Sequence, residues 1–284
     1  MAAFVIARLT FLEAVRRRIV LAASVLGLAF LILYATGFYF AQRDITPVAP
    51  DAPGLGMLYR NGLVSGFTIM GLYAVNFLAI VMAVLATADT LSGEIGSGTI
   101  QALVSKPLRR AEIVLGKWLG LAGLLGLYLL LMAGGIMLIA YVLTQFTVPN
   151  AFVGVGLVYL EILLIMTVTL ACSSTLSTLA TGGVALGLFG LAFLGGWVEQ
   201  FGALARSQTA VNLGIVSSLI MPSEAIWHRA SFEMTPAVAR TLGMAMAGPF
   251  ITTSVPSLLM VAYGLLYLLA GLAFAIHQFS HRDL

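Results

Sequence analysis

Six long apolar segments dominate this chain and limit what it can fold into. Each is close to the roughly 20 residues that an α-helix needs to cross the hydrocarbon core of a bilayer. They are Ile19–Phe40, Phe67–Thr87, Trp118–Thr144, Phe152–Ser174, Thr178–Val198 and Ser257–Phe279. Only 9% of the residues are charged, whereas soluble domains carry roughly 25%. So few charged residues could not cover the surface of a soluble protein of this length. The pattern predicts an all-α integral membrane protein with about six transmembrane helices.

Basic residues that flank these segments predict the orientation of the chain, because cytoplasmic connections carry an excess of lysine and arginine. One side holds nine: Arg8, Arg16, Arg17, Arg18, Lys106, Arg109, Arg110, Lys117 and Arg282. The other side holds five: Arg43, Arg60, Arg206, Arg229 and Arg240. We therefore expect both termini to be cytoplasmic and the protein to reside in the cell membrane. Basic residues at membrane edges, rather than along one face, do not indicate nucleic-acid binding.

Residues 1–18, which precede the first span, form an amphipathic segment. Phe4, Ala7, Phe11 and Val15 recur on one side at helical spacing, while arginines project elsewhere. A helix of this kind lies along the membrane surface. The sequence therefore predicts an N-terminal interfacial helix.

Two further segments lie outside the predicted spans. Residues 41–66 carry three prolines and several glycines and are expected to form an irregular loop. Residues 199–256 contain apolar stretches that are too short to span and are broken by prolines. We expect them to be extracytoplasmic short helices that lie at, or dip into, the outer leaflet. A seventh or eighth span in this region is the alternative.

The connection between the second and third spans, residues 88–117, is the most informative part of the chain. It combines seven charged residues with glycines and a proline. Gly93, Gly96 and Gly98 disfavour a long helix and permit a sharp turn. The residue before Pro107 avoids the α-helical region of backbone space, so a helix is expected to end there.

These features predict a compact helix–turn–helix on the cytoplasmic side. A short helix over 99–104 is followed by a second helix over 108–117, which leads into the third span. The first helix presents apolar side chains that are able to dock into a partner protein: Ile100, Leu103 and Val104. A solvated loop that only connects two spans is the alternative interpretation.

The order of residues in this connection is specific. It runs Gly93-Glu94-x-x-x-Gly98-Thr99-Ile100, then Leu103-x-Ser105-Lys106-Pro107-x-x-Arg110, then Gly116-Lys117. This run resembles the signature loop of ABC-2 type permeases, the transmembrane subunits of a class of ABC transporters. The amphipathic lead-in, the six spans and the long last outer segment are also similar to that family. The resemblance implies an ABC-2 transmembrane domain of the type V exporter kind.

In that family the loop is a coupling element that sits in a groove of the nucleotide-binding subunit. The resemblance implies an ATPase-coupling role for the matching residues here: Glu94, Gly98, Thr99, Ile100, Leu103, Pro107 and Arg110. The chain has no Gly-x-x-x-x-Gly-Lys-Ser/Thr run to cradle phosphates. ATP and magnesium are therefore expected on a separate ATPase, and this chain is not expected to be an enzyme. Two ATPases would assemble with two permease chains, identical or different, among membrane lipids.

Glu161 stands out because it lies about ten residues into the fourth span, near mid-bilayer at about 1.5 Å per residue. An ionisable group at that depth is costly and is a functional candidate. It is predicted, with Asn76, to line the substrate pathway or to bind a cationic substrate. The alternative is a protonated or hydrogen-bonded carboxyl that holds helices together, with Asn76, Tyr128 or Thr167 as its partner.

The predicted function is export of a lipid, drug or other amphiphilic substrate. An ion-driven secondary transporter is an alternative, although it would show paired charges in broken helices. A permease that serves maturation of a metalloenzyme, as in copper-site assembly, is another. An intramembrane enzyme would need a buried catalytic pair, and only isolated polar residues are seen. No metal site is predicted, because His277 and His281 supply only two ligands.

Overall fold

The computed structural model describes residues 2–45, 55–96, 109–237, 239–240 and 255–281, and all regular elements within these ranges are α-helices. They are α1 (Ala2–Arg16), α2 (Arg18–Ile45), α3 (Leu55–Gly96), α5 (Arg110–Thr144), α6 (Ala151–Ser173), α7 (Thr178–Leu204), α8 (Gln208–Ile220), α9 (Ser223–Met234) and α11 (Leu258–Ser280). Six of these, namely α2, α3, α5, α6, α7 and α11, are long and apolar enough to cross a bilayer. The predicted all-α, multi-pass class is confirmed.

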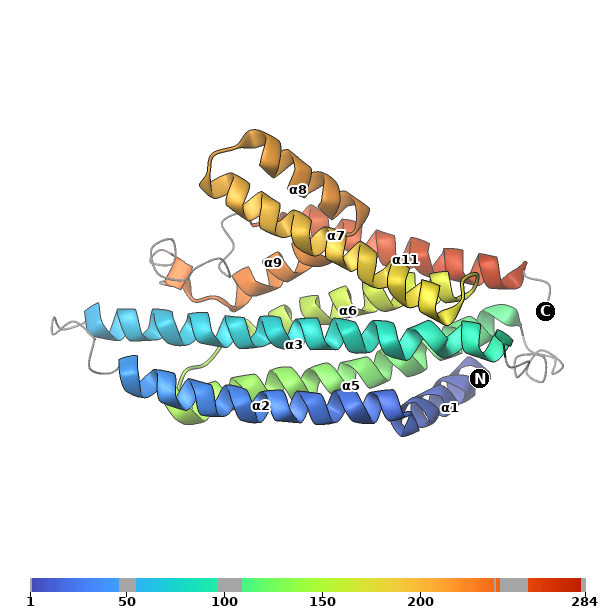
Figure 1. The fold of residues 1–284 in the computed structure, drawn as a ribbon, viewed down its shortest axis with the longest axis horizontal. Coiled ribbons are helices and arrows are strands. Elements are labelled where there is room, and N and C mark those ends of the chain that lie inside the picture. The colour runs from blue at the N-terminus through green and yellow to red at the C-terminus, as the bar shows by residue number, and fades with distance from the viewer. Residues whose placement is uncertain (1, 46–54, 97–108, 238, 241–254, 282–284) are drawn as a thin grey trace.

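The long helices run alternately back and forth along one axis (Figure 1). As a result, the start of α1 and the end of α11 lie at the same end of the bundle. The end of α3 and the start of α5 lie at that end too (Figure 1). We call it the stem end, because the two stems of the predicted coupling segment emerge there.

Helix α3 forms the centre of the bundle and packs against α2, α5, α6 and α7. In its most apolar stretch 61% of the residues are buried, compared with 11% in α2 and 17% in α11. The outer helices instead expose leucines such as Leu33 and Leu259, which are 70% and 80% exposed. In a bilayer, lipid tails solvate such side chains as well as a protein core does, so these faces are lipid-facing surfaces.

Helix α1 packs against the first turns of α5 through a notch made by two glycines one turn apart. A Cβ at Gly116 would lie 2.6 Å from Cβ of Ile6, and one at Gly120 would lie 2.5 Å from the carbonyl oxygen of Ala7. Neither position has room for a side chain. Glycines spaced in this way let two helix backbones approach closely.

The face that α1 buries coincides only in part with the predicted apolar side, to which Ala7 belongs. Ile6, Ala7 and Ala14 are buried against the bundle, whereas Phe4 is 76% and Val15 45% exposed. The apolar residues therefore lie on both sides of α1. The side that carries Ile6 and Ala7 fits the glycine notch, where it contacts Gly116 and Gly120. The other side remains outside the bundle.

The loop predicted over residues 41–66 is partly helical. Residues 41–45 belong to α2 and residues 55–66 to α3. Val64 is buried in a small cluster with Phe38 of α2, so packing between the two helices favours helical structure here. The prolines that indicated a loop all fall between the helices, outside the described residues.

Helix α3 also continues through Gly93 to its end at Gly96, where a turn was expected. A glycine inside a helix costs about 1 kcal/mol relative to alanine, whereas burying a leucine side chain contributes about 1.5–3 kcal/mol. Leu91 is fully buried in a cluster with Ile113 and Phe279, so packing outweighs the glycine. The short helix predicted over 99–104 lies outside the described residues.

In the segment predicted as extracytoplasmic, 199–256, α7 itself continues to Leu204 and is followed by α8 and α9. Helix α8 runs back along α7, and α9 is bent from α8 by 105°. Gly195 and Gly214 allow the close contact, since a Cβ at Gly195 would collide with the side chain of Ser217. Together α8 and α9 are long and apolar enough to form one bent span. Residues 241–254 are not described.

The glycine notch yields a test of how α1 is held. Gly120→Leu should destabilise the protein by about 1–3 kcal/mol, because the side chain cannot fit without moving α1. Gly134→Leu on the same helix is the matched control, since nothing lies within 4 Å of a Cβ there. Thermal unfolding of the purified chain measures both. Equal midpoints for the two variants would show that α1 does not sit in the notch.

Candidate functional site

Buried polar side chains gather where α3, α6, α7 and α9 meet. At the centre, Asn76 of α3 donates a hydrogen bond from Nδ2 to Oε2 of Glu161 on α6, at 3.1 Å. Glu161 is fully buried and Asn76 is 2% exposed. The structure therefore brings together the two residues that were predicted to line the substrate pathway.

A second group of polar residues adjoins this pair. The Tyr73 hydroxyl donates to Oε1 of Glu224 on α9, at 3.1 Å. Nε2 of His228 lies 3.4 Å from the same oxygen and 2.9 Å from Nε2 of Gln200 on α7. Both groups together form what we call the buried polar network: Tyr73, Asn76, Glu161, Gln200, Glu224 and His228.

Local sequence explains how these side chains converge. Tyr73 and Asn76 are three residues apart on α3 and so share a face. Glu224 lies in the first turn of α9, where the helix dipole favours a carboxylate. Gly196 makes room for it on α7, because a Cβ there would lie 2.4 Å from Cγ of Glu224.

The network holds more acceptor atoms than the described residues satisfy. Oε1 of Glu161, Oδ1 of Asn76 and Oε2 of Glu224 are buried and have no hydrogen-bond partner. A buried polar atom without a partner costs about 1–3 kcal/mol. Such atoms mark a place where a proton or a ligand group would be stabilised.

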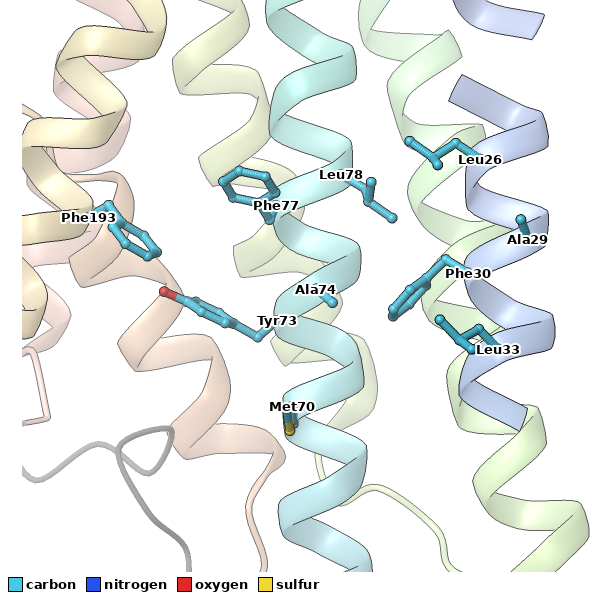
Figure 2. Close-up of a pocket in the computed structure, with 10 residues that line it drawn as sticks. All are labelled: Leu26, Ala29, Phe30, Leu33, Met70, Tyr73, Ala74, Phe77, Leu78 and Phe193. Carbon is cyan, nitrogen blue, oxygen red and sulfur yellow. The ribbon is translucent and has the colours of Figure 1, made fainter. Parts of the chain in front are cut away.

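An apolar groove lies beside the network, on the surface of the bundle between α2, α3 and α7. It has a volume of about 650 Å³. Figure 2 shows side chains from the three helices around it, including Phe30, Phe77 and Phe193. Tyr73 belongs to both features, because it also lines the groove. The centroid of its ring lies 6.4 Å from that of Phe193, with the rings stacked, and 5.0 Å from that of Trp227, with the rings tilted.

A second set of contacts holds the two stems together at the stem end. Asp89 near the end of α3 accepts a hydrogen bond from Thr178 of α7 at 3.2 Å and lies 3.7 Å from Arg17. Lys117 of α5 is only 3% exposed and donates to the carbonyl oxygen of Thr90 at 2.9 Å. Both stems are therefore fixed to each other and to neighbouring helices.

The start of α5 is fixed in two ways. The backbone N–H of Arg109 donates to the side chain of Glu112 at 3.2 Å, which caps the first turn. Arg110, predicted as a coupling residue, donates to the carbonyl oxygen of Ser280 at the end of α11, at 3.0 Å. This arginine therefore ties the α5 stem to the C-terminal helix.

The other predicted coupling residues cannot be placed in the same way. Glu94 lies in the last turn of α3, and its side chain is outside the described residues. Gly98, Thr99, Ile100, Leu103 and Pro107 lie outside the described residues as well. Their role in coupling stays a prediction.

Sequence reasoning missed several members of the sites. Lys117 was counted among the charges of the cytoplasmic connection, without the expectation that it is buried. Glu224 and His228 are four residues apart and thus on one helix face, which was the one available signal. Tyr73 and Gln200 carried none, because an isolated tyrosine or glutamine is common in apolar helices. Of the partners considered for Glu161, Asn76 is the one that the structure brings to it.

Comparison with known families identifies the chain's class. A sequence profile of the ABC-2 family transporter proteins matches residues 4–284. The chain belongs to this family, whose members are transmembrane permeases of ABC transporters. It is a transport subunit of the membrane, and the family implies partnership with an ABC ATPase. No curated protein matches the chain.

The contact between Asn76 and Glu161 can be tested by removing its donor. Asn76→Ala leaves Oε2 of the buried carboxyl without a partner, and we expect a destabilisation of about 1–3 kcal/mol. Asn212→Ala on α8 is the control, because Asn212 is exposed and accepts a hydrogen bond from Gln208, which is exposed as well; its effect should stay within about 0.5 kcal/mol. The measurement is unfolding in lipid bicelles. Similar effects would mean that Glu161 does not depend on Asn76.

Proposed function

We propose that this chain forms the translocation pathway of an ABC exporter and that residues 88–117 couple it to a separate ATPase subunit. The observation that supports coupling most directly is the anchoring of both stems at one end of the bundle. The α3 stem is a continuous part of the central helix, and the α5 stem continues into the third span. Any displacement of the segment between them acts on both spans.

The contacts at the stem end explain how such a displacement would spread. Asp89 connects α3 to Thr178 of α7 and to Arg17 beside α1. Lys117 connects the two stems, and Arg110 connects α5 to α11. Motion imposed on the stems by ATP-driven closure of a partner would therefore reach most of the bundle.

The complete transporter in this proposal contains two ATPase subunits, which bind ATP and magnesium, and two permease chains, identical or different. The protein lies in the cell membrane with its stem end on the cytoplasmic side, because nine of the 14 basic residues belong to that side. Hydrolysis takes place on the partner. This chain contributes the pathway.

The proposed substrate is amphiphilic, such as a lipid or a drug, and it moves outward. The groove supports this, since its lining is almost entirely apolar. One lining residue, Tyr73, is polar at its tip and hydrogen-bonds to Glu224 in the buried polar network. A small hydrophilic solute would find few partners on such a surface.

Changes in the coupling segment test the first part of the proposal. Glu94→Ala and Gly98→Val should each lower transport-linked ATP hydrolysis about tenfold, equivalent to about 1.4 kcal/mol, without loss of folded chain from the membrane. The assay uses the chain co-purified with its ATPase and reconstituted in vesicles.

Arg206→Ala is the control, because Arg206 is exposed in the α7–α8 connection, far from the stems. Hydrolysis that is unchanged in both coupling variants would refute the assignment of residues 88–117. Transport that follows an ion gradient without any ATPase would instead favour an ion-driven transporter.

Lys117 offers a second test, which concerns transmission rather than ATPase binding. Lys117→Met keeps the length of the side chain but removes the charge that bonds the Thr90 carbonyl. Co-purification with the ATPase should be unchanged, while stimulation of hydrolysis by substrate should fall severalfold. Arg18→Met, at an exposed arginine, should alter neither. Normal stimulation in Lys117→Met would show that the stems do not act together.

A further inference from the structure

Tyr73 joins the apolar groove to the buried polar network. Its ring forms part of the groove wall beside Phe77 and Phe193 (Figure 2). Its hydroxyl reaches past the wall to Oε1 of Glu224, at 3.1 Å. A group that displaced this hydroxyl from the groove side would therefore meet a carboxylate directly.

The two carboxyl groups behind this wall lack a permanent positive partner. Among the described residues, no lysine or arginine forms an ion pair with Glu161 or Glu224. Burying a carboxylate without a compensating charge is costly. The cost is lowered when a positive group arrives, and this favours binding of a cation.

His228 contacts the same carboxyl group from behind the wall. Its Nε2 lies 3.4 Å from Oε1 of Glu224 and 2.9 Å from the amide nitrogen of Gln200. The imidazole is therefore shared between Glu224 and Gln200 and helps to position the carboxyl group.

We propose that this groove binds a lipophilic organic cation, whose apolar body lies against the aromatic rings and whose positive group pairs with Glu224 in place of the Tyr73 hydroxyl. This inference rests on the proposed function in taking the groove as part of the transport pathway. It narrows the amphiphilic substrate class to molecules that carry a positive charge.

The lining of the groove supports this class over others. Phe30, Tyr73, Phe77 and Phe193 line the groove, and aromatic rings attract cations as well as apolar groups. An anion in place of the Tyr73 hydroxyl would be repelled by the Glu224 oxygen that this hydroxyl now bonds. A small inorganic cation would lose its hydration shell on an apolar wall and gain too few oxygen ligands in return.

Tetraphenylphosphonium and tetraphenylborate provide the test, because they have nearly the same shape and opposite charge. Binding of each is measured by equilibrium dialysis against the full chain in lipid nanodiscs, without ATP and with empty nanodiscs as background. We expect the cation to bind and the anion to bind at least tenfold more weakly. Equal affinity for the two ions would overturn the proposal.

Three variants locate the binding. Glu224→Gln should weaken binding of the cation about tenfold. Glu233→Gln on the same helix, where Glu233 is paired with Arg229, is the matched control and should bind as the native chain does. Tyr73→Phe keeps the ring and frees Oε1 of Glu224, so it should bind the cation at least as tightly as the native chain.

Native affinity in Glu224→Gln would place the cation elsewhere and overturn the proposal. If Glu224→Gln does not fold, the Tyr73→Phe variant decides, and weakened binding there would count against it. Because binding is measured without the ATPase, a negative result here leaves the coupling proposal standing. Unchanged hydrolysis in the Glu94 and Gly98 variants would refute the coupling assignment and likewise leave the cation proposal standing.

Discussion

The requirement that every backbone N–H and C=O group inside a bilayer be hydrogen-bonded within the protein governs this structure. Helices meet it within a single segment, which is why the spanning elements here are continuous helices of 23 residues or more. With the backbone satisfied, the helices are free to differ in what their side chains do. Helix α3 uses small and branched residues to pack on four neighbours, while α2 and α11 face lipid. The distinction between central and outer helices follows from packing, because lipid does not drive apolar faces together.

Charged and polar side chains are then placed where the packed helices enclose them. At the stem end, Asp89, Lys117 and Arg110 bond across helices and hold the two stems in one unit. Farther along the bundle, Asn76, Glu161 and Glu224 form a network that is only partly satisfied. The first set is suited to transmitting motion because its charges are paired or bonded to carbonyls. The second is suited to binding, since its free acceptors gain most from a ligand. The proposed transporter places coupling at one end and recognition in the interior.

Sequence reasoning succeeded where a local property decides the outcome and was less complete elsewhere. Hydropathy located six spans, because the length of an apolar run is a local property. Glu161 was singled out by its depth alone, and Asn76 was among its expected partners. Helix ends were predicted less well. Glycines near residue 93 and prolines near residue 50 indicated loops, yet packing of Leu91 and Val64 extends α3 at both ends. Local propensities of about 1 kcal/mol are easily outweighed by tertiary contacts.

By itself, the sequence determined that the chain is a multi-pass helical membrane protein, and its motif indicated the ABC-2 family. Both depend on residues close together in the chain, so they can be read without coordinates. Only the tertiary structure decided which side of α1 is buried, that Lys117 is enclosed, and that Tyr73 joins a groove to Glu224, 151 residues away. These features arise from contacts between separate helices. These contacts depend on where the helices cross and on glycines that let their backbones approach, such as Gly116 beside α1 and Gly196 beside Glu224.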